Sequence, residues 1–365
     1  MAKTSLKRIG VLTGGGDCPG LNAVIRAVTK TLIHDEEVEI VGFLDGYEGL
    51  VLNRYVRLDW KAVSNILTLG GTILGTSNTA NPMRWAEKKG TKIVIRDRSH
   101  DALHTFRRHR LDGLVVIGGD GSMAIAGELA ERGVPVVGVP KTIDNDVCGT
   151  EMTFGFQTAV GVATDALDRL HTTASAHHRV MVAEVMGRYA GWIALHATMG
   201  SGADILLIPE IPFKWDVVFD ACRSRERKGR RFSIVCVAEG ARPEGGKMTI
   251  QRTVEGSPDP VRLGGVGRLV AASIEQATGI ESRATVLGYV QRGGTPVAFD
   301  RVFATSLGWH AAALARAGQW GRMVSWRKGQ LADVAILDIA CGCRTVALDN
   351  PLLAAARSMG TCLAE

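Results

Sequence analysis

Short apolar runs alternate with longer amphipathic stretches along most of the chain. This alternation constrains the fold class more than any other feature of the sequence. Each run is rich in Val, Ile and Leu and has the length of a strand. Continuous apolar strands separated by amphipathic segments indicate parallel sheets covered by crossover helices. The runs that we expect to form strands are 9–12, 40–44, 113–117, 134–139, 180–184, 205–208 and 232–237.

The chain has 365 residues, which is more than one ordinary core accommodates. We therefore predict an α/β protein of two doubly wound, Rossmann-like domains with largely parallel sheets. The first would comprise residues 1–155 plus about 292–340, and the second residues 156–291 plus about 341–365. The stretch after about residue 324 carries few recognisable signals, so its role stays open.

Composition indicates a soluble globular protein, since 46% of the residues are hydrophobic, 22% are charged, and no apolar run approaches the ~18 residues of a membrane span. The first residues lead straight into a strand-like run without a signal-peptide core. Seven cysteines, an odd number without CxxC spacing, argue against a disulfide framework. A reducing cytoplasm is the expected location.

Charge favours anionic partners, because 43 basic and 37 acidic residues give a net charge of +6. The densest basic run, 223–231, has the composition of a solvated helix end. Aromatic residues make up only 5% of the chain and do not interleave with basic ones, so we expect no nucleic-acid partner. Phosphorylated small molecules are the favoured anions.

Glycines follow the first and third expected strands. Gly14, Gly15 and Gly16 close the first strand and open a helix, and Gly118 and Gly119 follow the strand at 113–117. Glycines let backbone amides approach a phosphate, and a helix N-terminus behind them favours negative charge. The chain lacks the GxxxxGK[ST] pattern, so this is no P-loop, and a plain tight turn remains an alternative for the first cluster.

Asp120 lies inside a weak match to a dinucleotide fingerprint, formed by Gly119, Gly121 and Ala124. A carboxylate there would repel a pyrophosphate directly. It suits a Mg²⁺ ion that bridges the carboxylate and the nucleotide phosphates, because Mg²⁺ prefers oxygen ligands.

Four polar side chains follow the strand at 134–139, namely Thr142, Asp144, Asn145 and Asp146. Such a cluster can accept a proton from a hydroxyl nucleophile and direct that nucleophile at phosphorus. A capping turn is the alternative, since Asp and Asn also begin helices and stabilise turns. Four such residues beside a glycine-rich loop favour a catalytic site.

At this point the chain resembles the 6-phosphofructokinases, which phosphorylate the 1-hydroxyl of fructose 6-phosphate. The resemblance covers roughly residues 7 to 320. It is carried by five motifs in order, at 14–17, 118–122, 140–146, 186–188 and 283–294.

The resemblance implies a glycolytic, cytoplasmic kinase that uses ATP and Mg²⁺ and forms a homodimer or homotetramer. Asp144 would be the general base, helped by Thr142 and Asp146, and Asp120 would hold Mg²⁺. The implied donor-binding residues of the first domain are Gly15, Gly16, Tyr47, Asn78, Thr79, Gly118, Gly119, Asp120, Gly121 and Ser122.

The second domain would bind fructose 6-phosphate, by the same resemblance. Arg179 and Arg283 would reach the sugar phosphate from a neighbouring subunit, so that the oligomer completes the site. Guanidinium forks suit phosphate oxygens. The implied substrate-binding residues from the same subunit are Thr142, Asp144, Met186, Gly187, Arg188, Glu239, Tyr289 and Arg292.

Two positions decide the phosphoryl donor. Gly121 leaves room for the α-phosphate of ATP, whereas pyrophosphate-dependent members of the family carry Asp there. Lys141 is typical of pyrophosphate users, so the pair is similar to the mixed-substrate branch of the family. We weigh the steric and charge argument more heavily and expect ATP, with pyrophosphate as the alternative.

The chain departs from the simpler bacterial pattern in two places. Asn78 stands where those members present an arginine to the donor phosphates, so Lys141 is expected to supply part of that charge. His171 and Lys30 stand where arginines bind the activating nucleotide. We therefore expect weak or absent control by ADP and phosphoenolpyruvate.

Two readings from other classes stay open on the residues alone. A Rossmann-type oxidoreductase would need an acidic residue after the second strand, and Asp45 is a loose candidate. A catalytically silent sugar-phosphate sensor would not need the full set of Asp120, Asp144 and Asp146. The histidines at 100, 104, 109, 177 and 178 lack a metal-site pattern, and Trp192 is expected in the core.

Overall fold

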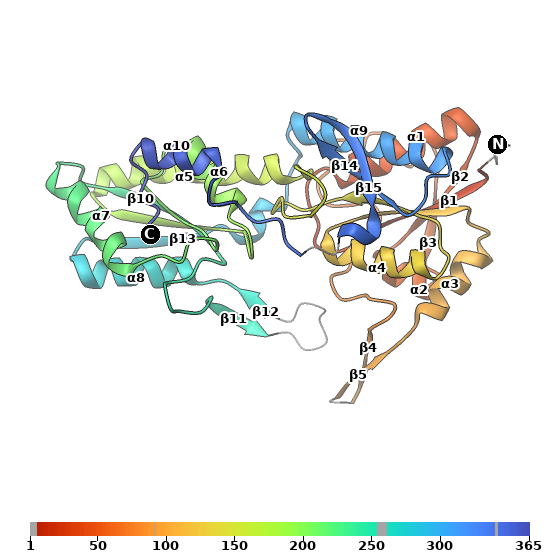
Figure 1. Ribbon diagram of the computed structural model, residues 1–365, viewed down its shortest axis with the longest axis horizontal. Coiled ribbons are helices and arrows are strands. Elements are labelled where there is room, and N and C mark those ends of the chain that lie inside the picture. The colour runs from red at the N-terminus through yellow and green to blue at the C-terminus, as the bar shows by residue number, and fades with distance from the viewer. Residues whose placement is uncertain (1–5, 91, 254–260, 340–341) are drawn as a thin grey trace.

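The computed structural model describes residues 6–90, 92–253, 261–339 and 342–365. Figure 1 shows two lobes side by side, each built on a sheet with helices on both faces. We call the lobe that contains the N-terminus the first lobe and the other the second lobe.

The first lobe contains a seven-stranded sheet in the order β15-β14-β7-β6-β1-β2-β3. The five inner strands run parallel, and the two edge strands, β3 and β15, run antiparallel to their neighbours. The strands are β1 (Arg8–Thr13), β2 (Glu39–Phe43), β3 (Tyr55–Leu58), β6 (Gly113–Gly118), β7 (Val136–Pro140), β14 (Arg322–Arg327) and β15 (Gln330–Ala335).

Two groups of helices cover opposite faces of this sheet (Figure 1). Helices α1 (Leu21–Glu36) and α9 (Ala298–Arg316) pack together on one face. Helices α2 (Tyr47–Leu52), α3 (Ser99–Arg108) and α4 (Asp120–Glu131) lie on the other. Every residue of β6 and β7 is buried, which explains why their sequences are apolar without alternation.

The second lobe contains a four-stranded parallel sheet in the order β13-β8-β10-β9. Helices α5, α6 and α10 lie on one side of it and α7 and α8 on the other (Figure 1). The strands are β8 (Val180–Val185), β9 (Ile205–Leu207), β10 (Ser233–Ala238) and β13 (Ser282–Val286). The helices are α5 (Phe156–His177), α6 (Trp192–Ser201), α7 (Trp215–Arg227), α8 (Val266–Thr278) and α10 (Pro351–Ser358), with a 3₁₀ turn, η1 (Gly288–Gln291), after β13.

Two antiparallel hairpins project from the same side of the molecule, one from each lobe (Figure 1). The first consists of β4 (Trp85–Lys89) and β5 (Lys92–Arg96), and the second of β11 (Ile250–Thr253) and β12 (Val261–Leu263). The chain enters the first lobe again with α9, β14, β15 and a 3₁₀ turn, η2 (Ile336–Ile339), and then ends in the second lobe, where Cys362 pairs with Ile205.

The expectation of an α/β fold with largely parallel sheets is confirmed, and all seven runs listed in the sequence analysis form strands. Trp192 is buried, as expected. Among the described residues, no helix is long and apolar enough to span a membrane. The expectation about cysteines holds in part, because five are free thiols whereas Cys148 is disulfide-bonded.

Candidate active site

The glycine-rich and acidic loops meet at one edge of the first sheet. They follow β1, β6 and β7, which are adjacent parallel strands, so their carboxyl ends lie together. Backbone hydrogen bonds join the loops directly, from Gly14 N to the oxygen of Ile117 (2.9 Å) and from Lys141 N to the oxygen of Gly118 (2.9 Å). The three loops, which are far apart in the sequence, therefore form a single site.

A second loop supports the first glycine cluster. Gly15 has a φ of +78°, its N–H donates to the oxygen of Ser77 (3.1 Å), and its own carbonyl accepts from the hydroxyl of Thr76 (2.6 Å). This brings Asn78 and Thr79, both exposed, next to the glycine loop. The predicted donor-binding residues of the two loops thus lie side by side.

The N-terminus of α4 forms the next wall of the site. Gly121 faces open space, since a Cβ placed on it would meet no atom within 4 Å. Gly118 is tightly enclosed, because a Cβ there would lie 2.2 Å from the Cβ of Ser122. Behind this turn the buried Tyr47 donates its hydroxyl hydrogen to the carbonyl of Ser122 (2.7 Å). Tyr47 therefore braces the turn from within the lobe.

Two cations reach the glycine loop from different lobes. The buried Lys141 donates from Nζ to the carbonyl of Gly16, and burial lowers the pKa of its ammonium. Arg292, which follows η1 of the second lobe, donates from Nη1 to the carbonyl of Asp17 (3.1 Å). A Cβ on Gly16 would lie 2.9 Å from this Nη1, so a larger residue there would displace the guanidinium of Arg292.

Asp144 has the environment of a proton acceptor. Its Oδ1 is buried and accepts no hydrogen bond from the described residues. Burial raises the pKa of its carboxyl, opposed by the positive charges of Arg292, Lys141 and Arg188. A carboxylate with a raised pKa and a buried oxygen that has no hydrogen-bond partner among the described residues is suited to accept a proton.

The loop around Asp144 is fixed by short-range hydrogen bonds. The backbone N–H of Asp144 donates to the hydroxyl of Thr142 (3.1 Å). Asn145 adopts a φ of +54°, and its Oδ1 accepts from the N–H of Thr153 (2.9 Å). Asn is among the residues that tolerate this left-handed conformation, which turns the two flanking carboxylates to their places.

Asp146 also has a raised pKa, of about 7, because of burial first and then of the negative charges of Asp144 and Asp120. The thiol of Cys343, from the C-terminal segment, donates to Oδ2 of Asp146 at 3.6 Å. The negative charges of Asp144 and Asp120 beside Asp146 make the site attractive to a cation.

Asp120 is exposed in the first turn of α4, beside the glycine loops. Within the described ranges, no three His, Cys, Asp or Glu side chains converge as a metal cage. Mg²⁺ commonly binds one or two carboxylates and takes its other ligands from substrate phosphates and water. An exposed carboxylate at this place fits that mode of binding.

The second lobe contributes loops at the carboxyl ends of β8 and β10. The backbone N–H of Glu239 donates to the oxygen of Val185 (2.9 Å), and that of Gly240 donates to the oxygen of Gly187 (3.1 Å). Gly187 has a φ of +132°, a conformation that favours glycine. Burial, followed by the charges of Asp144 and Glu184, raises the pKa of Glu239 to about 7.

The two lobes face each other at the site. The pKa of Asp144 responds to Arg188 and Arg292, and the pKa of Glu239 responds to Asp144, so these charges are close. The backbone N–H of Met186 donates to Oε1 of the buried Gln291 (3.3 Å). This hydrogen bond ties the residue next to Arg292 to the loop that follows β8. The predicted sugar-binding residues of one chain thus converge opposite the acidic loop.

Three predicted residues do not join this cluster. Arg179 directly precedes β8 and donates to Glu281 (2.6 Å), and Arg283 in β13 donates to the same carboxylate (2.5 Å). Met186 follows the opposite end of the six-residue β8. At a rise of ~3.3 Å per residue, about 20 Å separates Met186 from Arg179. Tyr289 is 75% exposed on η1.

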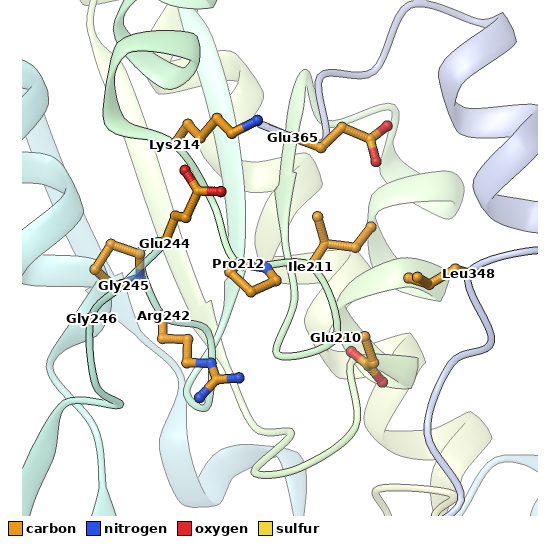
Figure 2. Close-up of a pocket in the computed structure, with 11 residues that line it drawn as sticks. Glu210, Ile211, Pro212, Lys214, Arg242, Glu244, Gly245, Gly246, Leu348 and Glu365 are labelled. Carbon is orange, nitrogen blue, oxygen red and sulfur yellow. The ribbon is translucent and has the colours of Figure 1, made fainter.

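The sequence analysis missed the contribution of the C-terminal segment. Cys343 and Arg344 contact the acidic loop, and no motif or periodicity in their neighbourhood announces it. A separate pocket of about 530 Å³ lies beside the same segment in the second lobe, between Arg242, Lys214 and Glu365 (Figure 2). None of the predicted site residues is among its described lining.

Comparisons with known proteins agree on one family. The phosphofructokinase family model matches residues 8–315. The chain is 44% identical over 362 residues to ATP-dependent 6-phosphofructokinase 2 of Clostridium perfringens, covering 99% of both chains. It is 47% identical to the ATP-dependent 6-phosphofructokinase of Chloroflexus aggregans, covering 97% of both.

Solved structures show the same fold. The phosphofructokinase of Saccharomyces cerevisiae superposes with a TM-score of 0.75 at 30% identity, covering 91% of this chain and 45% of that chain. A pyrophosphate-dependent phosphofructokinase of Nitrosospira multiformis gives a TM-score of 0.79 at 20% identity, covering 94% and 86%. At that identity the second likeness concerns the fold alone.

Proposed function

Because the chain belongs to the phosphofructokinase family, we propose that its interlobe site transfers the γ-phosphoryl group of ATP to fructose 6-phosphate. The products are fructose 1,6-bisphosphate and ADP. The protein is a phosphotransferase of glycolysis, an ATP-dependent 6-phosphofructokinase like its curated relatives.

The unpartnered Oδ1 of Asp144 carries the assignment of roles. Oδ1 of Asp144 accepts the proton of the sugar 1-hydroxyl. The hydroxyl oxygen of the sugar then bonds to the γ-phosphorus of ATP, and the bond between the γ-phosphorus and the bridging oxygen of the leaving ADP breaks. Thr142 and Asp146 help to place the sugar and the transferring group. Asp120 would hold Mg²⁺, whose charge would offset that of the donor phosphates.

The two lobes divide the substrates between them. The first lobe binds the nucleotide through the glycine loops, with Asn78 and Thr79 beside them and Tyr47 behind. The second lobe binds the sugar phosphate through Arg188 and Glu239, together with Arg292 at the boundary between the two lobes. The division at residues 1–155 plus about 292–340, and 156–291 plus about 341–365, is supported by the strand membership of the two sheets.

ATP is the donor, in keeping with the curated relatives. The open space at Gly121 leaves room for an α-phosphate. Lys141 and Arg292, drawn to the carbonyls of the glycine loop, supply the positive charge that Asn78 does not. A residual pyrophosphate activity is the second candidate, favoured by the presence of Lys141.

Arg179 and Arg283 act on the site of a neighbouring subunit in a homodimer or homotetramer. Their ion-pair cluster with Glu281 lies at the end of β8 opposite Met186, which supports a role outside their own subunit's site. The enzyme works in the cytoplasm, where its phosphorylated substrates are found.

The direct test supplies the purified protein with fructose 6-phosphate and Mg²⁺, with ATP and pyrophosphate in parallel. We expect fructose 1,6-bisphosphate with ATP, and loss of that activity in Asp144→Asn with the fold retained. Turnover with pyrophosphate alone would overturn the donor assignment. Inactivity with both donors would favour a silent sugar-phosphate sensor.

A further inference from the structure

The C-terminal segment contacts the acidic loop on several atoms. The backbone N–H of Arg344 donates to the carbonyl of Asp146 (2.8 Å), and Val147 pairs with Cys343 in an antiparallel bridge. The side chain of Arg344 donates from Nη2 to the carbonyl of Asn145. Arg344 therefore binds the carbonyl oxygens of the two residues that follow Asp144.

The same arginine is anchored in the second lobe. Its guanidinium carbon lies 4.4 Å from the ring centroid of Trp192, and the indole N–H of Trp192 donates to the carbonyl of Arg344 (2.9 Å). Trp192 is the first residue of α6, four residues after Arg188. Cation–π contact and hydrogen bond together fix Arg344 to the lobe that binds the sugar.

Two residues further on, a half-buried carboxylate strengthens this anchor. Glu210, beside the pocket of Figure 2, accepts from the N–H of Val346 (2.8 Å) and from the N–H of Gly191 (2.9 Å) with the same Oε1. Gly191 directly precedes Trp192. The C-terminal segment is thus tied to the start of α6 at two places and to the acidic loop at three atoms.

We propose that Arg344 is a positioning residue for phosphoryl transfer, which ties the Asn145–Asp146 backbone to Trp192 and so holds Asp144 against the sugar-binding lobe. The inference rests on the proposed function. Asn145 has a left-handed φ and lies between the two carboxylates, so the orientation of its carbonyl governs where both side chains point. Displacing a catalytic group by ~1 Å lowers the reaction rate on the order of 10²-fold.

The cost of burying Arg344 supports a specific role. Its Nε is buried and has no hydrogen-bond partner among the described residues, and burial lowers the pKa of the guanidinium. A buried donor left without a partner destabilises the fold. Neutral side chains could join the segment to α6 without this cost, whereas only a planar cation can stack on Trp192 and donate to Asn145 together.

The experiment compares Arg344→Ala and Arg344→Lys with the wild type. Arg357→Ala is the matched control, because Arg357 lies in α10 of the same C-terminal region and pairs only with Glu365 among the described residues. For each protein we would measure thermal unfolding, fructose 6-phosphate affinity by calorimetry without ATP, kcat and KM.

For Arg344→Ala we expect kcat to fall about 10–100-fold, with sugar affinity nearly unchanged. Arg344→Lys should recover part of the loss, and Arg357→Ala should match the wild type. An unchanged kcat in folded Arg344→Ala would overturn the inference, and so would a loss of affinity that accounts for the whole loss of activity. If Arg344→Ala does not fold, the test uses Arg344→Lys and Trp192→Phe instead. A wild-type kcat in both of these variants would refute the positioning role of Arg344.

These outcomes separate the inference from the proposed function. A wild-type protein that is inactive with ATP and with pyrophosphate refutes the proposed function. An active wild-type protein with a fully active Arg344→Ala variant refutes only the positioning role.

Discussion

Lys141 donates a hydrogen bond from its Nζ to the backbone carbonyl of Gly16. The contact joins the loop after β7 to the loop after β1, and it places a buried ammonium beneath the glycines that are proposed to bind the donor phosphates. Arg292 approaches the same glycine from the second lobe. The positive charge beside the proposed donor site therefore comes from Lys141 of the first lobe and from Arg292 on the side of the second lobe, whereas Asn78 is neutral.

Removing the charge of Lys141 should strongly weaken turnover. We expect Lys141→Gly and the better-filling Lys141→Met to lower kcat with ATP by about 10²-fold, a loss typical for one preorganised group that stabilises transition-state charge. Steady-state kinetics with both donors measure the effect, and Lys88→Met on the exposed hairpin is the control. Near-wild-type rates in both Lys141 variants would contradict this role.

The position of the two glycine loops at one edge of the sheet was largely predictable from sequence, because it depends on local signals. Gly14–Gly16 and Gly118–Ser122 follow buried strands, and their spacing alone places them at one sheet edge. The strands themselves were found because full burial makes them continuously apolar.

The rest of the structure depends on partners distant in sequence. β14 and β15 complete the first sheet with three buried residues in the middle of β14 and mostly half-buried residues in β15. Strands β5 and β11 of the two hairpins are largely exposed, so none of these strands shows the continuous apolar signal of the inner strands. The contact of Arg344 with Asn145 spans 199 residues. No local pattern encodes such a contact.

Gly121 should determine the donor by space and charge. A carboxylate introduced by Gly121→Asp would enter the open region that the α-phosphate of ATP needs. We expect ATP turnover to fall by more than about 10²-fold, which corresponds to ~3 kcal/mol of repulsion between the new carboxylate and the α-phosphate. Pyrophosphate turnover should be retained or increased. Gly121→Ala, which adds volume without charge, is the matched control, and an equal loss with both donors would contradict the assignment.

The pH dependence should show an acidic limb near neutrality. Burial and the charges of Asp144 and Asp120 raise the pKa of Asp146 to about 7, so its ionised form is lost as the pH falls through that value. We expect kcat/KM for fructose 6-phosphate to fall below about pH 7. The thiol of Cys343 stabilises the ionised carboxylate, so Cys343→Ala should raise the pKa of Asp146 and move the limb to higher pH.

The control for this pH experiment is Cys362→Ala, another half-buried free thiol, in the second lobe. Full pH–rate profiles of the three proteins would be compared at saturating ATP. A Cys343→Ala limb at the wild-type position, or below it, would show that the thiol does not act on Asp146.

Activation by ADP should be weak or absent. Lys30 already stacks on Trp60, with its Nζ 4.0 Å from the ring centroid, and His171 packs edge-on against Phe232. By the resemblance to the 6-phosphofructokinases, these two side chains would stand where other members bind the activating nucleotide with arginines. Saturation curves for fructose 6-phosphate, with and without ADP and phosphoenolpyruvate, should be hyperbolic and coincide. A strongly sigmoidal curve relieved by ADP would prove the expectation wrong.

Two inactive variants should restore each other if the active site is shared between subunits. Asp144→Asn removes the base of its own site, and Arg283→Ala removes a phosphate contact that the chain offers to its neighbour. In a hybrid dimer, the site built on the Arg283→Ala chain has an intact Asp144 and receives an intact Arg283 from the other chain. Mixing equal amounts under exchange conditions should recover roughly a quarter of wild-type activity, since half of the dimers are hybrids with one working site each.

The measurement needs each variant alone, the mixture before exchange, and the mixture after exchange, with the oligomeric state followed by light scattering. Arg268→Ala, which removes an exposed arginine of α8, replaces Arg283→Ala as the control and should be active without mixing. Glu281 holds Arg179 and Arg283 together at the far end of β8, so Glu281→Gln should weaken the sugar-phosphate contact from the same side. A stable oligomer that exchanges subunits without any recovery would show that Arg283 serves its own chain.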